Sequence, residues 1–313
     1  MSFTRESLNR RDFLKTLAGT GAALGVPDTG LSASSGMYVS LHPVLTNQKP
    51  AWPEFARLAA RAGYGGVDME KDMAMKEGLD ATRRLFAELK VKPAVARPSL
   101  NFGRDEAGFQ AVLKGIDAIG KFAAAVDCPR IAIVMPASSE TPKAELRKIY
   151  KDRLTAVAEI LRRSNVRFGL EFMGPLEARK RQKYEFIWRM DEMLDFAKEC
   201  GPNVGLLVDS WHWYHAGATV DEIIAAGKSR IVHIHVADCA RIPPEEVRDS
   251  QRLMPGEGVI DLVGFFQALK KIGYEDGIAP EVLGRVPKDM SPEDGARLGL
   301  ETTLAVMRKA RVA

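Results

Sequence analysis

The feature that most constrains the fold is an alternation of short apolar runs with longer amphipathic stretches, which begins at Met37. Eight runs rich in β-branched and apolar residues predict strands, at 37–42, 65–70, 91–96, 130–134, 167–171, 204–209, 231–235 and 277–281. Eight stretches with helical spacing alternate with them, at 51–63, 79–90, 106–127, 142–164, 185–200, 219–228, 260–272 and 292–310. Eight strand–helix units in about 275 residues predict an α/β fold, the (β/α)₈ TIM barrel.

Local signals support this pattern. Asp80, Asp105 and Thr219 are expected N-caps, and Pro292 lies where a first-turn proline is tolerated. The alternative fold, a doubly wound sheet, normally has a glycine-rich phosphate-binding turn after its first strand. Residues 41–50, LHPVLTNQKP, contain no glycine. We therefore expect one barrel rather than an open sheet.

The N-terminal segment has a different character. Paired arginines in NRRDFLK (residues 9–15) precede a weakly apolar stretch over residues 16–26. This order resembles the twin-arginine export signal S/T-R-R-x-F-L-K and departs from it only at Asn9. The resemblance implies a signal peptide and linker at residues 1–36, the barrel at 37–313, and a periplasmic or exported protein. The alternative is an amphipathic first helix with a chance Arg-Arg pair.

Composition and charge narrow the classes of partner. The 45 Lys and Arg against 41 Asp and Glu leave a net charge of +4, too balanced for a dedicated nucleic-acid binder. No apolar run reaches the roughly 18 residues that span a bilayer, so stable membrane insertion is not expected. The three cysteines form no CxxC pair, which argues against a disulfide framework or a zinc knuckle. An enzyme with a small-molecule substrate remains, and a homo-oligomer is left open.

Four polar side chains stand at or near the ends of consecutive predicted strands: Glu171, Asp209, His235 and Glu281. In a barrel the C-terminal strand ends form one rim, so these side chains are expected to meet there. Charged groups at buried strand ends are costly unless paired, which indicates a bound cation. Three carboxylates and one imidazole favour one divalent ion, Mn²⁺ first, with Mg²⁺ or Co²⁺ as alternatives. The other interpretation is four ordinary loop-edge groups.

Three runs carry a family resemblance. DSWHWYHAG (209–217), IVHIHV (231–236) and RLMPGEGVIDL (252–262) resemble the xylose-isomerase-like barrel superfamily, most of all inosose (2-keto-myo-inositol) isomerases and ketose 3-epimerases. The organisation is similar over the whole barrel, and the detailed similarity covers residues 165–285. The resemblance implies that the four strand-end residues above are metal ligands. It also implies that His212 contacts a substrate hydroxyl.

Further substrate contacts are expected from the resemblance and from position. Glu177 lies six residues after Glu171, as a substrate-contacting Glu does in ketose 3-epimerases. The substrate-binding Arg of those enzymes corresponds to Arg241 by distance from the metal-binding His, or to Arg252 by the R-L-x-P-G-E-G run. We favour Arg252 because its flanking sequence matches as well. His42 ends the first strand, where it is expected either to contact substrate or to be a loop histidine.

The ligand set predicts a reaction as well as a metal. A divalent cation that bridges a carbonyl and its neighbouring hydroxyl stabilises an enediolate, the charge that develops when an α-proton leaves. Glu171 and Glu281 are the expected catalytic pair that removes and returns the proton. This predicts a metal-dependent isomerase or epimerase of a keto-sugar or keto-cyclitol. The alternatives are a lyase or dehydratase, for instance β-elimination from a 3-keto-glycoside, and a non-catalytic periplasmic sugar-binding protein.

Other conspicuous residues have plainer interpretations. His233 is expected to point into the barrel one layer below His235, as a packed or supporting histidine rather than a fifth ligand. Trp211, Trp213 and Tyr214 either wall a sugar site or pack at the rim.

Overall fold

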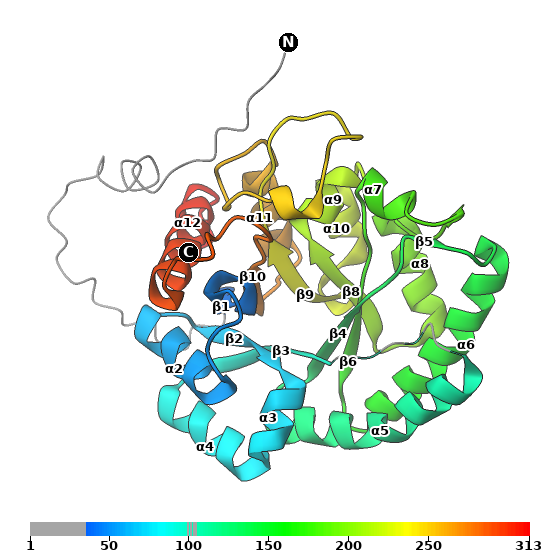
Figure 1. The fold of residues 1–313 in the computed structure, drawn as a ribbon, viewed down its shortest axis with the longest axis horizontal. Coiled ribbons are helices and arrows are strands. Elements are labelled where there is room, and N and C mark those ends of the chain that lie inside the picture. Colours follow the sequence, from blue (N-terminus) through cyan, green and yellow to red (C-terminus); the bar gives the residue numbers. More distant parts are fainter. Residues whose placement is uncertain (1–35, 99, 101, 103–104) are drawn as a thin grey trace, which may run out of the picture. The chain divides into compact units, whose positions relative to one another are not determined.

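Eight parallel strands close into a barrel in the computed structural model of the chain, which describes residues 36–313 except 99, 101, 103 and 104 (Figure 1). In spatial order the strands are β1 (Tyr38–Leu41), β2 (Gly66–Glu70), β3 (Lys92–Arg97), β4 (Arg130–Val134), β6 (Arg167–Glu171), β8 (Val204–Asp209), β9 (Ile231–Val236) and β10 (Gly277–Pro280). β10 pairs with β1 and closes the ring. The predicted (β/α)₈ barrel is confirmed, and every predicted strand is present. The predicted signal and linker, residues 1–36, lies outside the described residues apart from Gly36.

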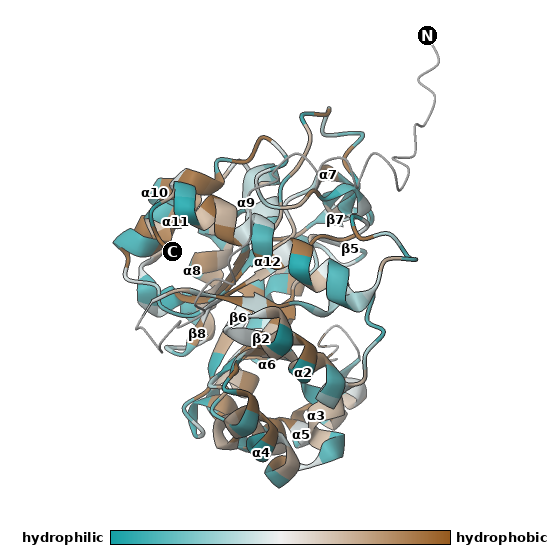
Figure 2. Cartoon of the chain, turned by 90° about the vertical axis from the view of Figure 1, so that its left-hand side faces the viewer, coloured by the Kyte–Doolittle hydropathy of each residue, from teal (hydrophilic) through white to brown (hydrophobic). Residues whose placement is uncertain are grey.

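Helices surround the barrel, and the predicted ones are all found. They are α2 (Trp52–Ala62), α4 (Leu79–Leu89), α5 (Glu106–Ala125), α6 (Lys143–Arg162), α8 (Met190–Cys200), α10 (Val220–Ala226), α11 (Leu262–Lys271) and α12 (Pro292–Lys309). In Figure 2 these helices carry both hydrophilic and hydrophobic residues, as expected of amphipathic helices on a barrel. No helix in the described part of the chain is long and apolar enough to cross a membrane.

Several short elements were not predicted. They are the helices α3 (Lys71–Glu77), α7 (Leu176–Arg179) and α9 (Ser210–His215), the 3₁₀ turns η1 (Pro43–Thr46), η2 (Lys228–Arg230) and η3 (Asp249–Gln251), and a two-stranded sheet of β5 (Ser138–Ser139) and β7 (Tyr184–Glu185). Most of them lie in the connections that leave the C-terminal ends of the strands. This is the end of a barrel at which active sites are built.

The helix starts follow the predicted chemistry with one exception. The Asp105 carboxylate accepts a hydrogen bond from the Gly108 amide at 2.8 Å, and Thr219 forms a capping box with Glu222. Pro292 is the first residue of α12. The prediction that Asp80 caps its helix is wrong, because α4 already begins at Leu79, after a glycine with φ of 94°. Asp80 instead lies in the first turn, where a carboxylate is favoured by the helix dipole.

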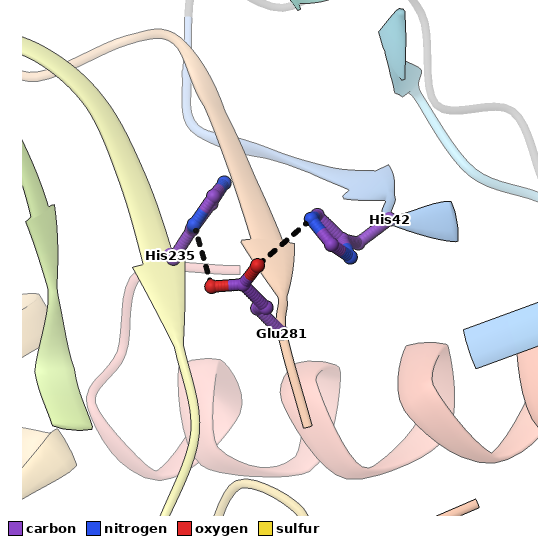
Figure 3. Close-up of side chains that lie close together, drawn as sticks. All are labelled: His42, His235 and Glu281. Carbon is purple, nitrogen blue, oxygen red and sulfur yellow. Dashed lines mark hydrogen bonds and ion pairs between the residues drawn. The ribbon is translucent and has the colours of Figure 1, made fainter. Parts of the chain in front are cut away.

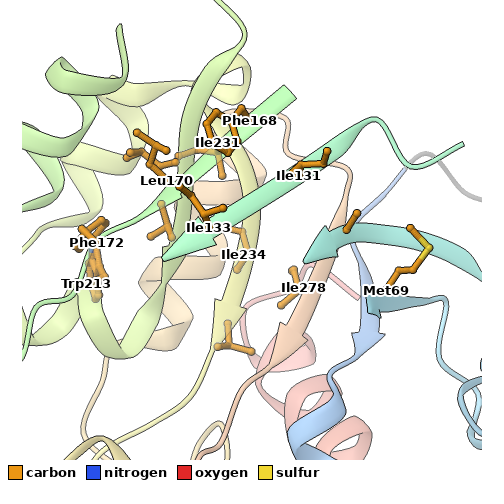
Figure 4. Packing of buried hydrophobic residues seen from close by; sticks show 14 of the residues in the cluster. Met69, Ile131, Ile133, Phe168, Leu170, Phe172, Trp213, Ile231, Ile234 and Ile278 are labelled. Atoms are coloured by element: carbon orange, nitrogen blue, oxygen red, sulfur yellow. The ribbon is translucent and has the colours of Figure 1, made fainter. Parts of the chain in front are cut away.

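Side chains alternate between the two faces of each strand, and this decides what reaches the site. Phe168 and Leu170 of β6 face outward into the large hydrophobic cluster that joins strands to helices (Figure 4). Gly169 and Glu171, at the alternate positions, therefore face the barrel interior. The same alternation turns other strand-end polar groups inward.

The barrel interior itself is small and partly polar. Val95, Ala132 and Leu207 form a hydrophobic cluster separate from the outer one. A Cβ on Gly169 would lie 3.2 Å from Val232 and 3.3 Å from Ala132, so the interior is tightly packed there. Buried polar side chains from β1, β2 and β9 are Ser40, Asp68, His233 and His235.

Candidate metal centre and active site

The structure brings the four strand-end residues together. Glu171, Asp209, His235 and Glu281 each offer one ligand atom, and these atoms lie within 4.8 Å of one another. All four side chains are buried, so they meet away from bulk water. Glu171 ends β6, Asp209 ends β8, His235 lies one residue before the end of β9, and Glu281 directly follows β10. We call these four the rim cluster.

His235 joins the rim cluster to a deeper polar layer. Its Nδ1 lies 3.1 Å from Glu281 Oε2 and 3.7 Å from Glu171 Oε1, while its Nε2 lies 3.0 Å from Asp68 Oδ2. Burial opposes protonation, but the Glu281 carboxylate and the hydrogen bond to Asp68 hold the pKa of His235 well above its usual range. His235 Nδ1 is the nitrogen that faces the other rim-cluster residues.

His233 lies below His235, as its position on the strand predicted. It is fully buried, and its Nε2 lies 3.1 Å from the same Asp68 oxygen. Burial opposes ionisation of Asp68, but its contacts with His233 and His235 hold its pKa well below the usual range. Asp68 was not identified from the sequence. A carboxylate inside the buried run GVDME was the available signal.

Arg252 enters the rim cluster from the chain that follows η3. Its Nη1 donates to Asp209 Oδ2 at 2.6 Å, to the Glu281 carbonyl at 2.9 Å and to Glu281 Oε2 at 3.2 Å. Its Nε donates to Asp249 Oδ1 at 2.8 Å, and the side chain is only 1% exposed. Arg241, the alternative assignment, is exposed, and among the described residues it makes no hydrogen bond or ion pair with the rim cluster. The geometry therefore favours Arg252 over Arg241.

The turn after Arg252 is fixed by the carboxylate of Asp238. Asp238 Oδ2 accepts hydrogen bonds from the amides of Gly256 and Gly258, and Oδ1 accepts one from the amide of Ile260. The backbone of Asp238 also pairs with that of Leu253, the next residue after Arg252. The PGEG turn therefore serves to hold the chain segment that presents Arg252.

His42 and Arg97 complete the rim on the side of β1 and β3. His42 Nε2 lies 3.2 Å from Glu281 Oε1, as Figure 3 shows, and contacts the Arg97 guanidinium. Burial and the charge of Arg97 lower the pKa of His42 to about 4, so this ring is neutral. Arg97 itself lies 3.5 Å from Glu281 Oε1. Arg97 was not predicted as a site residue, because it ends β3 one position beyond the strand predicted at 91–96.

Glu281 is surrounded by donors. Burial would raise its pKa, but His235, His42 and Arg252 hold the pKa well below the usual range. The carboxylate is therefore ionised and acts as an acceptor. Arg285, four residues further along the chain, forms an ion pair with Glu257 at 2.9 Å. Glu281 itself is buried among the groups of the rim cluster and is not a surface residue.

The two remaining residues predicted to contact substrate, His212 and Glu177, lie in different environments. His212, on α9, is buried with its Nε2 3.3 Å from Arg252 Nη2, and burial and the Arg252 charge lower its pKa to about 4. Glu177, on α7, is 40% exposed and 4.0 Å from Arg248, and it does not reach the rim cluster. His212 therefore lies beside the centre, whereas Glu177 lies on the surface.

The conspicuous aromatic residues mostly pack. Trp211 is buried, and the Arg252 guanidinium lies 5.6 Å from the centre of its ring. Trp213 is buried against Phe265, with ring centres 5.4 Å apart. Trp211 therefore packs against the Arg252 guanidinium, and Trp213 is a packing residue at the rim.

The donor set fits a divalent cation. Glu171 Oε1 is buried and has no hydrogen-bond partner, which is costly for a carboxylate oxygen. Three carboxylates and one imidazole nitrogen converge on one point, the chemistry expected of an oxygen-rich site for a divalent metal. Such an arrangement can bind a cation and move a proton between two carboxylates.

Comparison of the whole chain with known proteins identifies relatives of two kinds. Inosose isomerase of Halalkalibacterium halodurans is 25% identical over 236 residues, 74% of this chain and 80% of that protein. 3-Dehydroshikimate dehydratase of Pseudomonas putida is 21% identical over 265 residues, 83% of this chain but 40% of that longer protein. The relatives therefore include both an isomerase and a dehydratase.

Solved structures show the same fold. A xylose isomerase domain protein from Alicyclobacillus acidocaldarius superposes with a TM-score of 0.81 at 29% identity, covering 88% of this chain and all of that one. The IOLI protein with a bound zinc atom gives 0.75 at 22% identity, covering 88% and 99%. D-Psicose 3-epimerase from Clostridium cellulolyticum H10 gives 0.67 at 17% identity, covering 88% and 98%.

Two family profiles match the chain. The twin-arginine translocation pathway signal sequence matches residues 7–27, which confirms the predicted export signal. The profile described as xylose isomerase-like TIM barrel matches residues 56–309. The chain therefore belongs to the xylose isomerase-like TIM barrel family.

Proposed function

We propose that this protein is a divalent-metal-dependent isomerase or epimerase of a keto-sugar or keto-cyclitol that acts through an enediolate. The observation that carries the proposal is the pair of buried carboxylates, Glu171 and Glu281, whose oxygens lie 3.7 Å and 3.1 Å from His235 Nδ1. Two such groups can remove a proton from one face or carbon of a substrate and return it at another. The similarity to inosose isomerases supports a keto-cyclitol or keto-sugar as the substrate class.

The rim cluster would hold the metal. The ligands would be the carboxylates of Glu171, Asp209 and Glu281 and the Nδ1 atom of His235. A divalent cation bound there would polarise a substrate carbonyl as a Lewis acid. Mn²⁺ is the proposed ion, with Mg²⁺ or Co²⁺ as alternatives. The zinc atom bound by the IOLI protein supports a divalent ion in this fold, so Zn²⁺ belongs in the same test.

The other residues would bind and orient the substrate. Arg252 offers N–H donors beside the rim cluster. Neutral His212 accepts from Arg252 through Nε2 and so carries its N–H on Nδ1, and the N–H of His42 faces Glu281. Glu171 is the best-placed base because its Oε1 has no competing hydrogen-bond partner. Burial of all these groups keeps water from the reacting carbon, which protects a reactive intermediate from side reactions.

A second candidate reaction is dehydration or β-elimination. The dehydratase relatives favour it, because removal of the same α-proton leads to elimination when the β-carbon carries a leaving group. The export signal also fits an enzyme of glycoside breakdown, for instance one that acts on 3-keto-glycosides. A third candidate, a non-catalytic periplasmic sugar-binding protein, would not need two buried base carboxylates.

Proton exchange in D₂O, followed by NMR, separates these candidates. The purified protein is loaded with Mn²⁺ and incubated with a panel of ketoses, inososes and 3-keto-glycosides. Deuterium in a recovered or isomerised sugar supports the isomerase or epimerase, and loss of a substituent supports the lyase. Binding without either reaction would overturn both catalytic proposals.

Matched variants make this experiment specific to the site. Glu171→Gln should abolish deuterium incorporation, because it removes the proposed base. Glu145→Gln makes the same change on the exposed face of α6 and should leave exchange unchanged. Equal exchange in wild type and Glu171→Gln would refute the role of Glu171.

A further inference from the structure

Beneath the rim cluster lies a second layer of buried polar side chains, which shares His235 with it. It consists of Ser40 from β1, Asp68 from β2, and His233 with His235 from β9. All four side chains are fully buried. We propose that Asp68 is a positioning residue, which fixes the His235 ring so that Nδ1, and not Nε2, faces the metal. This inference rests on the proposed metal centre and adds to it a residue that does not touch metal or substrate.

The contacts of Asp68 account for both of its oxygens. Oδ1 accepts a hydrogen bond from Ser40 Oγ at 2.8 Å. Oδ2 lies 3.1 Å from His233 Nε2 and 3.0 Å from His235 Nε2. A buried carboxylate without partners would be strongly destabilising, and three donors at these distances satisfy this one. Asp68 therefore has a defined position and a defined role as acceptor.

The acceptor role decides which nitrogen of His235 carries hydrogen. A carboxylate accepts hydrogen bonds only, so His235 must present Nε2–H to Asp68 Oδ2. With hydrogen on Nε2, Nδ1 is the ring nitrogen that can bind a metal, and it lies 3.1 Å from Glu281 Oε2 and 3.7 Å from Glu171 Oε1. A metal-binding histidine whose second nitrogen is held by a carboxylate has a fixed tautomer and a fixed ring orientation.

The same geometry argues against a second metal in the lower layer. Asp68, His233 and His235 could in principle form a three-ligand group, since their ligand atoms also lie within 4.8 Å of one another. Both imidazole nitrogens, however, lie at direct hydrogen-bond distance from one oxygen, Asp68 Oδ2. Metal stoichiometry distinguishes the two interpretations.

The first test measures metal affinity. The dissociation constants of Zn²⁺ and Mn²⁺ are determined by chelator competition for wild type, Asp68→Asn and Ser40→Ala. Asp68→Asn keeps the shape of the side chain but removes the charge that holds Nε2–H, so the dissociation constants should rise about 10–100-fold. Ser40→Ala leaves the contact with His235 in place and should change them far less. Unchanged affinity in a folded Asp68→Asn variant would overturn the inference.

A second measurement uses the wild-type chain and does not depend on a variant that folds. Long-range ¹H–¹⁵N spectra of the Zn²⁺-loaded protein report the protonation of each ring nitrogen, and the chain has only five histidines. We expect His235 to show a protonated Nε2 and a metal-bound Nδ1. Metal on Nε2, or two Zn²⁺ per chain, would overturn the positioning role. Failure of the wild type to bind any divalent metal would instead overturn the proposed function on which the inference rests.

Discussion

Replacing Glu281 with glutamine separates its two proposed roles, as ligand and as base. The substitution keeps the size of the side chain and an acceptor oxygen, but it removes the negative charge. That charge faces His235 at 3.1 Å, Arg252 and His42 at 3.2 Å, and Arg97 at 3.5 Å. The change therefore removes an anion that lies next to the cationic groups of Arg252 and Arg97.

The expected effects on metal binding and on turnover follow from these contacts. At an effective dielectric constant of about 20, two unit charges 3.2 Å apart attract each other by about 5 kcal/mol before desolvation is counted. Arg252 keeps Asp209 and Asp249 as partners, so the loss of folding stability should stay below the roughly 3–5 kcal/mol typical of breaking a buried pair. Metal affinity should fall by more than the about 10–100-fold typical of outer partners, because a direct ligand loses its charge. Loss of a positioned base should lower the rate by about 10²–10⁴.

Excess Mn²⁺ distinguishes the two roles. Turnover and bound metal are measured together for Glu281→Gln across a Mn²⁺ titration, with Glu145→Gln as the charge-matched surface control. Restored metal occupancy with turnover still absent identifies a base, whereas full rescue identifies a ligand alone. Turnover like that of the wild type, at unchanged metal content before any Mn²⁺ is added, would refute the centre described above.

Three further predictions concern other parts of the chain. Replacing Arg10 and Arg11 together with lysine should abolish export, and unchanged periplasmic protein by fractionation would contradict the signal. The pKa of His212 is about 4 in the fold against 6.5 as its ordinary value, so the unfolded chain binds more protons between these values and stability falls as the pH falls through them. From pH 7 to 5 this one group should cost about 2 kcal/mol, and a His212→Gln variant with the same pH 7-to-5 difference in urea unfolding as wild type would refute it. Asp238→Ala removes the charged acceptor of three backbone amides, of which that of Ile260 is buried, and should cost at least about 3 kcal/mol in urea unfolding, so a loss below about 1 kcal/mol would show that water replaces the carboxylate.

The sequence predicted the barrel and the rim cluster for the same reason. Strand-end residues such as Glu171 and Asp209 follow apolar runs, and parallel strands in a barrel bring their C-terminal ends to one rim. Asp68 could not be placed in this way, because it lies inside a strand. Its contact with His235 joins residues 167 positions apart and depends on how the ring closes.

Loop contacts were harder to predict than strand ends. The match of flanking sequence favoured Arg252 over Arg241, but only the folded turn held by Asp238 shows how Arg252 reaches the centre. Glu177 was expected near the substrate from the resemblance to ketose 3-epimerases, because it lies six residues after Glu171. That distance does not fix where a short helix such as α7 (Leu176–Arg179) directs its side chains.

Arg252 gives the barrel a cation of its own. Its guanidinium lies against Asp209 and Glu281, so the three carboxylates of the rim cluster do not face one another without positive charge. Small zinc domains, by contrast, remain unfolded until their ion arrives. For a protein with a twin-arginine signal, this difference matters because that pathway exports proteins that are already folded. We therefore expect the barrel to fold before export whether or not a divalent ion is present.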